Sequence, residues 1–162
     1  MSSLTDSRNL TILPLLTALM LSAMTASASH NLPFRLGDEG TITFTSPSTA
    51  TTAGTGNATH MGRISSDGNL TIVGEVNCND NEVGFAAEMQ DTFTAANGDT
   101  VTTAITMQLC PIAPGIYHGV GTYIVTGGTG RFANATGSGL FDGTGNFNTG
   151  TIICALNGTI SR

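Results

Sequence analysis

The sequence predicts an all-β domain, and in particular a single eight-stranded antiparallel closed barrel, from three observations. Apolar side chains recur at every second position after residue 28, as they do in strands with one buried face. The same region is rich in Gly, Thr and Val and carries almost no helix signal. Short connections between strands are typical of an antiparallel meander. Such a meander exposes two edges unless it closes, so a barrel is the first prediction and a two-sheet β-sandwich the alternative.

The alternation divides the region after the leader into expected strands. In the fourth of them, Phe85, Ala87 and Met89 share one face and Glu88 lies on the other. Asp67-Gly68 and Asn97-Gly98 are dipeptides that favour tight hairpin turns. The expected strands are 39–46, 55–65, 69–77, 83–92, 100–110, 116–126, 136–143 and 150–160.

The first 28 residues resemble a removable secretory signal peptide. A short polar start precedes an apolar run at 10–23, and Ala26-Ser27-Ala28 is a small-x-small cleavage pattern. Pro14 interrupts the run, which is also shorter than the roughly 20 residues that span a bilayer. The sequence thus predicts a signal peptide at 1–28, an N-terminal tail at 29–38 and a barrel domain at 39–162. The protein is expected to be secreted or periplasmic, with no membrane insertion after cleavage.

The charge composition excludes several kinds of partner and chemistry. The chain has five Lys and Arg against eleven Asp and Glu, for a net charge of −6, and all five basic residues are Arg. An acidic surface with few, scattered Arg repels phosphate backbones, so no nucleic acid partner is expected. Without Lys, the chain can form neither a Schiff base nor a P-loop.

The cysteines predict one disulfide. An exported protein meets oxidising conditions, and three cysteines leave one over. Cys78 and Cys110 end strands that run in the same direction, so they are expected at the same rim and are predicted to pair. Cys154 lies in mid-strand among apolar neighbours and is expected to be a small buried hydrophobe.

A glycine-rich segment at 127–139 is the most distinctive local pattern. We expect it to form a tight corner in which Phe132 plugs the barrel end and Arg131 caps carbonyls or pairs with a rim carboxylate. Its motif Gly-Gly-Thr-Gly-Arg-Phe at 127–132 resembles the corner of dirigent and allene oxide cyclase-like proteins. The segments 59–63 and 150–160 resemble exported bacterial proteins of the same general kind.

This resemblance implies an eight-stranded barrel with a central cavity and a homo-oligomeric assembly. Plant members of the family act on phenoxy radicals or on an unsaturated fatty-acid epoxide. Their cavity residues have no counterparts that can be matched one by one in this chain, so the resemblance carries no catalytic residue across.

No motif predicts a metal or a cofactor. His30, His60 and His118 lack the spacing of metal ligands and are expected on the surface or the rims. Glu75 and Glu88 lie on the polar faces of adjacent strands, where a solvated surface is favoured over an acid/base pair.

The candidate ligand site is the barrel interior. Apolar walls with a few polar handles suit a small, largely apolar ligand, although small barrels are often filled by their own side chains. Arg63, two residues after Met61, is interpreted as a lone inward charge. The predicted ligand-binding residues are Arg63, Phe85, Met89, Met107, Tyr117 and Tyr123.

Three functions fit these predictions. The first is an exported barrel with a binding or structural role. The second is a cofactor-free cyclase or isomerase, in which the cavity folds a hydrophobic substrate into one reactive conformer. The third is a surface adhesive role, prompted by the alternating Thr side chains at 41–45, although one strand does not make a flat array. The sequence does not decide whether the protein is an enzyme.

Overall fold

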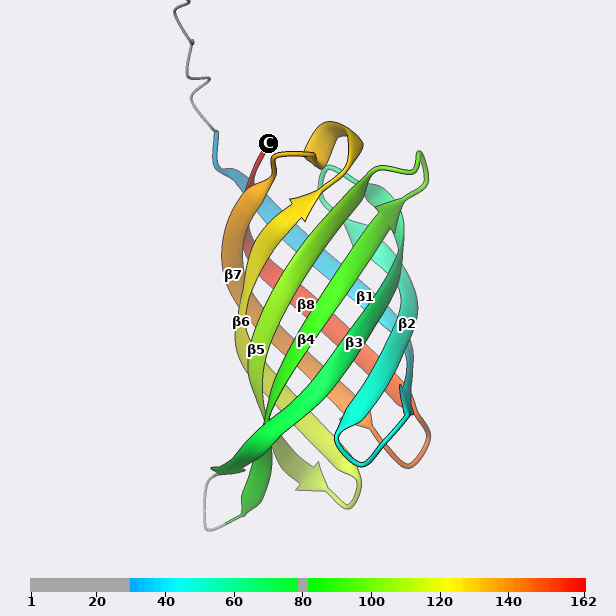
Figure 1. The fold of residues 1–162 in the computed structure, drawn as a ribbon, viewed down its shortest axis with the longest axis vertical. Helices are drawn as coiled ribbons and strands as arrows, with labels where there is room; N and C mark the ends of the chain where they lie inside the picture. The colour runs from blue at the N-terminus through cyan, green and yellow to red at the C-terminus, as the bar shows by residue number, and fades with distance from the viewer. Residues whose placement is uncertain (1–29, 79–81) are drawn as a thin grey trace, which may run out of the picture.

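The computed structural model describes residues 30–78 and 82–162, which form one closed barrel of eight antiparallel strands (Figure 1). Each strand pairs with the next along the chain, and β8 pairs with β1 to close the barrel. The predicted barrel is therefore confirmed, and the β-sandwich alternative is excluded. The strands are β1 (Leu32–Phe44), β2 (Thr49–Ala58), β3 (Gly62–Asn77), β4 (Val83–Ala95), β5 (Thr100–Ala113), β6 (Ile116–Gly128), β7 (Thr136–Asn146) and β8 (Thr151–Ser161).

The first strand begins earlier than the sequence suggested. The predicted signal peptide at 1–28 lies outside the described residues, but β1 starts at Leu32, so most of the segment predicted as a tail is strand. Phe34 and Leu36 are buried and continue the two-residue alternation. They pair with Gly158 and Leu156 of β8, so this segment closes the barrel. No helix among the described residues is long and apolar enough to span a membrane.

The boundary between β2 and β3 also differs from the prediction. The strand predicted at 55–65 is wrong, because the chain turns at residues 59–61, where His60 has a φ of 67° and Gly62 one of 74°. Asp67-Gly68 lies in the middle of β3 and makes no turn. Asn97-Gly98 does form the turn between β4 and β5, with a φ of 86° at Gly98, as predicted.

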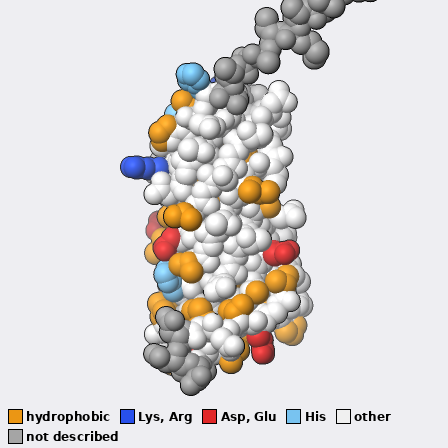
Figure 2. All heavy atoms as spheres, turned by 90° about the vertical axis from the view of Figure 1, so that its left-hand side faces the viewer, with side chains coloured by type: hydrophobic (Ala, Val, Ile, Leu, Met, Phe, Trp, Pro, Cys, Tyr) orange, Lys and Arg blue, Asp and Glu red, His pale blue; other side chains and the backbone are white. Residues whose placement is uncertain are grey.

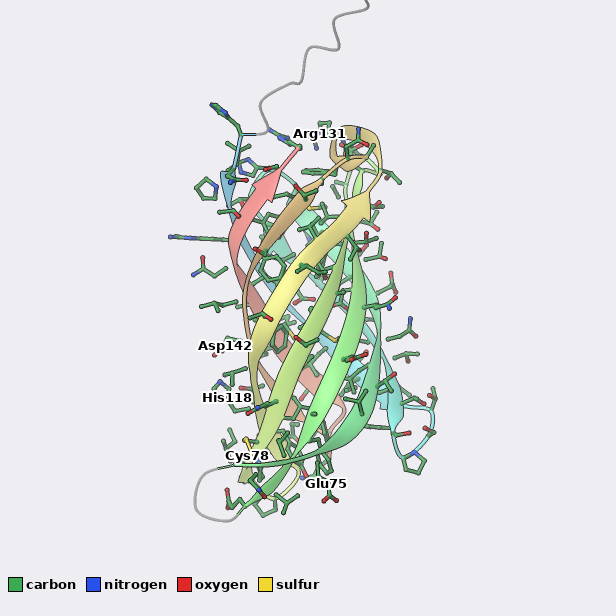
Figure 3. All side chains as sticks on the ribbon, turned by 60° about the vertical axis from the view of Figure 1, so that its left-hand side comes forward. Glu75, Cys78, His118, Arg131 and Asp142 are labelled. Atoms are coloured by element: carbon green, nitrogen blue, oxygen red, sulfur yellow. A yellow bond between two sulfur atoms is a disulfide. The ribbon has the colours of Figure 1, made fainter. Side chains whose placement is uncertain are left out.

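The glycine-rich corner after β6 closes one end of the barrel. The short 3-10 helix η2 (Gly130–Phe132) places the Phe132 ring in a fully buried position, which confirms the predicted plug. Arg131 forms an ion pair with Asp99 of the β4–β5 turn, so of the two contacts predicted for Arg131 the structure shows the pairing with a carboxylate at the rim. The guanidinium groups of Arg131 and Arg162 lie 5.6 and 5.7 Å from the centroid of the Phe132 ring. Arg131 and Glu75 lie at opposite ends of the molecule (Figure 3).

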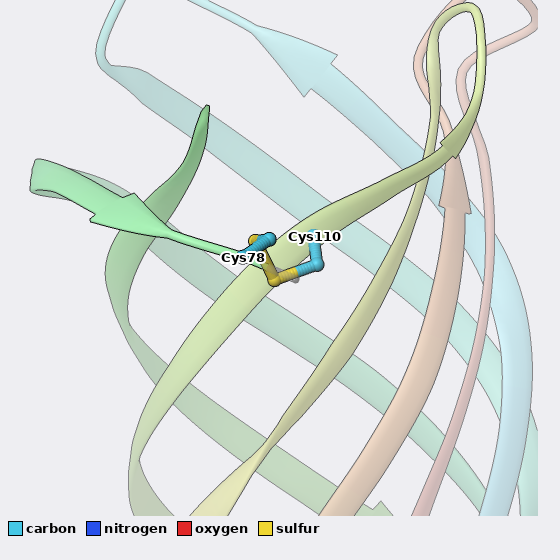
Figure 4. The surroundings of a disulfide bond; sticks show 2 residues. All are labelled: Cys78 and Cys110. Carbon is cyan, nitrogen blue, oxygen red and sulfur yellow. A yellow bond between two sulfur atoms is a disulfide. The ribbon is translucent and has the colours of Figure 1, made fainter. Parts of the chain in front are cut away.

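The predicted disulfide between Cys78 and Cys110 is present, with 5.8 Å between the two Cα atoms (Figure 4). It joins the end of β3 to β5 across β4, the strand that lies between them. The disulfide lies on the outer face of the barrel, because Leu109, next to Cys110 in the chain, faces inward. Gly84 of β4 leaves room for it, since a Cβ atom there would stand 2.5 Å from the Cys78 Sγ atom. Cys154 is the third cysteine and carries a free thiol.

Candidate functional site

A small cavity lies inside the barrel, at the end where β1 and β7 finish and β2 and β8 begin. Its volume is about 30 Å³, which is room for one or two water molecules and not for a ligand. The rest of the interior is filled by core side chains. The cavity is lined by Ile42, Thr52, Leu70, Met89, Met107, Leu109, Gly119, Phe141, Gly143, Thr144, Gly145, Phe147, Ile152 and Cys154.

Four aromatic rings from different strands and one turn gather at this end. Phe147, in the turn between β7 and β8, stacks on Tyr117 with 4.8 Å between the ring centroids and packs edge-on against Phe44 at 5.0 Å. Tyr117 in turn lies 5.7 Å from Phe85. Phe147 lines the cavity and contacts two of these rings, so the four aromatic side chains border the cavity at this end of the barrel and are called the aromatic cover below.

Polar groups lie at the inner end of the cavity. The Thr52 hydroxyl lines the cavity and donates a hydrogen bond of 3.4 Å to Asp91 Oδ1 on β4. Nearby, the Ser66 hydroxyl donates a hydrogen bond of 2.6 Å to Asp38 Oδ2 on β1. Cys154 on β8 is the cross-strand partner of Asp38 and also lines the cavity. Two carboxyl groups and a thiol thus come together next to an apolar pocket.

Burial changes the protonation of these groups. Burial, together with the negative charge of Asp38 and against the Thr52 hydrogen bond, raises the pKa of Asp91 to about 7. Burial also raises the pKa of Asp38, although its hydrogen bond from Ser66 opposes the shift. Burial and then the two carboxylates raise the pKa of the Cys154 thiol, so this thiol stays protonated and is no nucleophile. The Asp91 carboxyl therefore changes charge near neutral pH.

Two buried hydroxyl groups have no hydrogen-bond partner among the described residues. Thr103 on β5 is 2% exposed and lies directly across from Asp91 in the β4–β5 register. Tyr123 on β6 is 1% exposed, and burial raises its pKa. A buried hydroxyl without a partner costs about 1–3 kcal/mol, so both groups call for an explanation.

The structure separates the six predicted ligand-binding residues. Met89 and Met107 line the cavity, and Phe85 and Tyr117 belong to the aromatic group at its mouth. Tyr123 is buried in a different part of the interior, where its ring packs 6.3 Å from Phe34.

The predicted inward charge at Arg63 is wrong. Arg63 is exposed, because Ile64 and Ser66 occupy the inner face of β3 and the alternate positions, Arg63 and Ser65, therefore point outward. Met61, from which its direction was inferred, lies in a turn where the alternation does not apply.

Asp38, Thr52 and Asp91 are not among the site residues predicted from the sequence. For Asp91 a signal was present, because it follows Phe85, Ala87 and Met89 at the same two-residue spacing and so belongs to their inward face. Asp38 continues Phe34 and Leu36 in the same way, but its segment was taken for a tail. Thr52 lies in a strand of Thr, Ala and Gly, where no apolar contrast shows which face is buried.

Glu75, Glu88, His118 and Asp142 lie on the outer surface. Glu75 and Glu88 are both exposed, as predicted for a solvated face. His118 Nε2 lies 3.1 Å from Asp142 Oδ2 on the outer face, and the side chains of this pair are 41% and 68% exposed (Figure 3). Within residues 30–78 and 82–162, no three His, Cys, Asp or Glu side chains come together as metal ligands.

No family model, no curated protein and no solved structure matches this chain, so the resemblance to dirigent and allene oxide cyclase-like proteins rests on the short motifs alone.

Proposed function

We propose that this chain is an exported binding protein that takes up a small, largely apolar molecule at the Phe147 end of the barrel. The observation that carries the proposal is the apolar cavity beneath a cover of aromatic rings. Apolar walls with a few polar groups at one point are typical of small-molecule sites.

Binding requires the cover to move. The cavity of about 30 Å³ is much smaller than the roughly 150 Å³ of a cavity that admits benzene. Phe147 belongs to a turn outside the strands, so its ring can rotate without breaking strand pairing or the hydrogen bond that its backbone N–H donates to Gly115 O. Buried side chains, among them Phe34, Phe93 and Phe132, fill the opposite half of the barrel and confine the proposed ligand to this end.

Two features support export. The leader at 1–28 has the regions of a signal peptide, and the Cys78–Cys110 disulfide is typical of oxidising compartments. Edman sequencing of the protein from its own host is expected to give Ser29 as the first residue.

The test of binding compares two variants of the purified protein. Phe147→Ala removes the cover, so a neutral apolar probe such as hexanol is expected to bind at least about fivefold more tightly. Leu140→Ala, on the outer face of β7, is the control and is expected to leave the affinity for the probe unchanged. The probe is followed through the methyl NMR signals of Met89 and Met107, which line the cavity. If neither the parent protein nor Phe147→Ala shifts these signals, the proposal is wrong.

One observation favours an enzyme as the second candidate. A carboxyl group with a pKa of about 7 beside a pocket is suited to moving a proton at neutral pH. In a cofactor-free cyclase or isomerase, Asp91 would act as general acid or base through Thr52. Native mass spectrometry of protein from its own host would identify a bound molecule, and Asp91→Asn should then lower the turnover of that molecule by about 100-fold or more.

The implied homo-oligomer also stays a proposal. Val120, Ile124, Leu140 and Ile153 expose apolar surface on β6, β7 and β8. On the face seen in Figure 2, apolar side chains form separate islands rather than one continuous patch. Sedimentation equilibrium would measure the assembly, and Leu140→Glu is expected to dissociate it if these strands form the contact.

A further inference from the structure

The carboxyl groups of Asp38 and Asp91 have no cationic partner in the barrel. The chain contains no Lys, and the arginines of the described residues, at 35, 63, 131 and 162, are all exposed. Asp38 lies on β1 and Asp91 on β4, and the two strands between them, β2 and β3, carry Thr52 and Ser66. Asp38 accepts a hydrogen bond from Ser66 and Asp91 accepts one from Thr52, and the negative charge of Asp38 acts on Asp91. A buried carboxylate without a counter-charge is strongly unfavourable, so this pair requires either a proton or a cation from outside the chain.

Two glycines provide the space that these acids and their hydroxyl partners occupy. Gly68 is the cross-strand partner of Asp91, and a side chain there would collide with the carboxyl group of Asp91 and the hydroxyl of Thr52. A Cβ atom at Gly54 would stand 2.8 Å from the Ser66 hydroxyl and 3.1 Å from Asp38 Oδ2. Glycine at both positions lets the polar groups gather at mid-barrel.

A second and independent observation indicates a ligand. The Thr103 hydroxyl is buried, points inward beside Asp91 and has no partner among the described residues. Its strand neighbours on the same face, Val101 and Ile105, are buried apolar residues. Because a threonine hydroxyl can both donate and accept, Thr103 can accept a hydrogen bond from a donor bound at Asp91.

The cavity ends beside this group, and the two carboxyl groups and the Thr103 hydroxyl lie just behind its lining. Thr52 and Cys154 line its inner end. Thr52 is the hydrogen-bond partner of Asp91, and Cys154 is the cross-strand partner of Asp38. Met89, also in the lining, precedes Asp91 on the same face of β4. A molecule that enters past Phe147 therefore meets apolar side chains first and the two carboxyl groups last.

We propose that the ligand of this pocket is an apolar molecule that carries one protonated amine, and that its ammonium group binds the carboxyl groups of Asp38 and Asp91. This inference rests on the proposed binding function. An ammonium group has three N–H donors, which match the two carboxylates and the Thr103 hydroxyl. The apolar part would lie against Met89 and Met107, whose flexible side chains adapt to different shapes.

The test uses three probes with the same six-carbon chain, namely hexylamine, hexanol and hexanoate, and follows the Met89 and Met107 methyl signals at pH 8. Hexylamine is expected to bind at least about tenfold more tightly than hexanol, and hexanoate most weakly. The affinity for hexylamine should fall below pH 7, because Asp91 then takes up a proton.

Matched variants separate the inference from the binding function. Asp91→Asn is expected to bring hexylamine to the affinity of hexanol, while Asp142→Asn, on the exposed outer face, leaves the preference unchanged. Thr103→Val keeps the volume of the side chain and is expected to weaken hexylamine by about threefold or more while leaving hexanol unaffected. Equal binding of hexylamine and hexanol to the parent protein overturns the inference and leaves the pocket standing. If no probe shifts either methyl signal, the inference and the proposed function both fall.

Discussion

Asp91 and Gly68 are direct cross-strand partners inside the barrel, and the Asp91 carboxyl group fills the space that a side chain at Gly68 would need. This relationship explains why an Asp-Gly dipeptide that resembles a turn lies in mid-strand. Gly68 leaves room for the Asp91 carboxyl group on the inner face of the barrel, and it does not reverse the chain.

Gly68→Ala is therefore expected to destabilise the protein by about 1–3 kcal/mol, because the added methyl group overpacks the Asp91 site. Urea unfolding followed by circular dichroism measures the change. Gly74→Ala in the same strand is the matched control, since a Cβ atom there meets nothing within 4 Å and its stability should change by less than about 0.5 kcal/mol. If both variants unfold at the same urea concentration as the parent, the packing at Gly68 has been misinterpreted.

The raised pKa of Asp91 gives stability a specific pH dependence. The folded protein holds a proton up to about pH 7, whereas the unfolded chain releases it near 3.8. The folded state thus binds more protons between these values, so the contribution of Asp91 to stability is largest below about pH 4 and falls by about 3–4 kcal/mol as the pH rises to 7.

Asp91→Asn removes the titrating carboxyl group, so the variant is expected to be more stable than the parent at pH 8. The difference in free energy of unfolding between the two proteins should shrink toward pH 4. Chemical unfolding at both pH values measures it. A smaller slope of the same sign should remain, because the pKa of Asp38 is also raised. An advantage that is equal at pH 4 and pH 8 would contradict the assigned protonation.

The disulfide is expected to stabilise the barrel end next to β4. Replacing both Cys78 and Cys110 by Ala should lower stability by about 2–4 kcal/mol. Dithiothreitol should lower the Tm of the parent and leave that of the double variant unchanged. Mass spectrometry of a non-reduced digest should show Cys78 linked to Cys110, and Cys154 should react with iodoacetamide only after unfolding. A peptide that links Cys110 to Cys154 would be inconsistent with the strand order.

Tyr123→Phe is expected to leave stability unchanged or to raise it by up to about 1–2 kcal/mol, because the buried hydroxyl has no partner among the described residues. Thermal unfolding measures the change. Tyr117→Phe, at the partly exposed aromatic cover, is the control and should have little effect. A loss of more than about 1 kcal/mol for Tyr123→Phe would reveal a partner for its hydroxyl.

Local sequence was sufficient where a short pattern indicated the structure that it actually forms. Asn97-Gly98 was recognisable as a turn, which the positive φ of Gly98 confirms, and Phe132 among glycines was recognisable as a buried plug. It failed where a dipeptide has two uses. Gly68 favours a turn by itself, and only its partner Asp91, 23 positions later in the chain, shows that the site needs a missing side chain.

The sequence by itself determined that the strands alternate buried and exposed positions, that they follow one another as an antiparallel meander, and that Cys78 and Cys110 lie at one rim. Only the tertiary structure decided that Asp38, Thr52, Ser66 and Asp91 share one polar region inside the barrel, and that Arg63 lies outside it. The physical reason is that alternation fixes only the face on which a side chain lies. Which inward side chains meet depends on strand register and on closure of the barrel, and these are set by contacts between residues far apart in the chain.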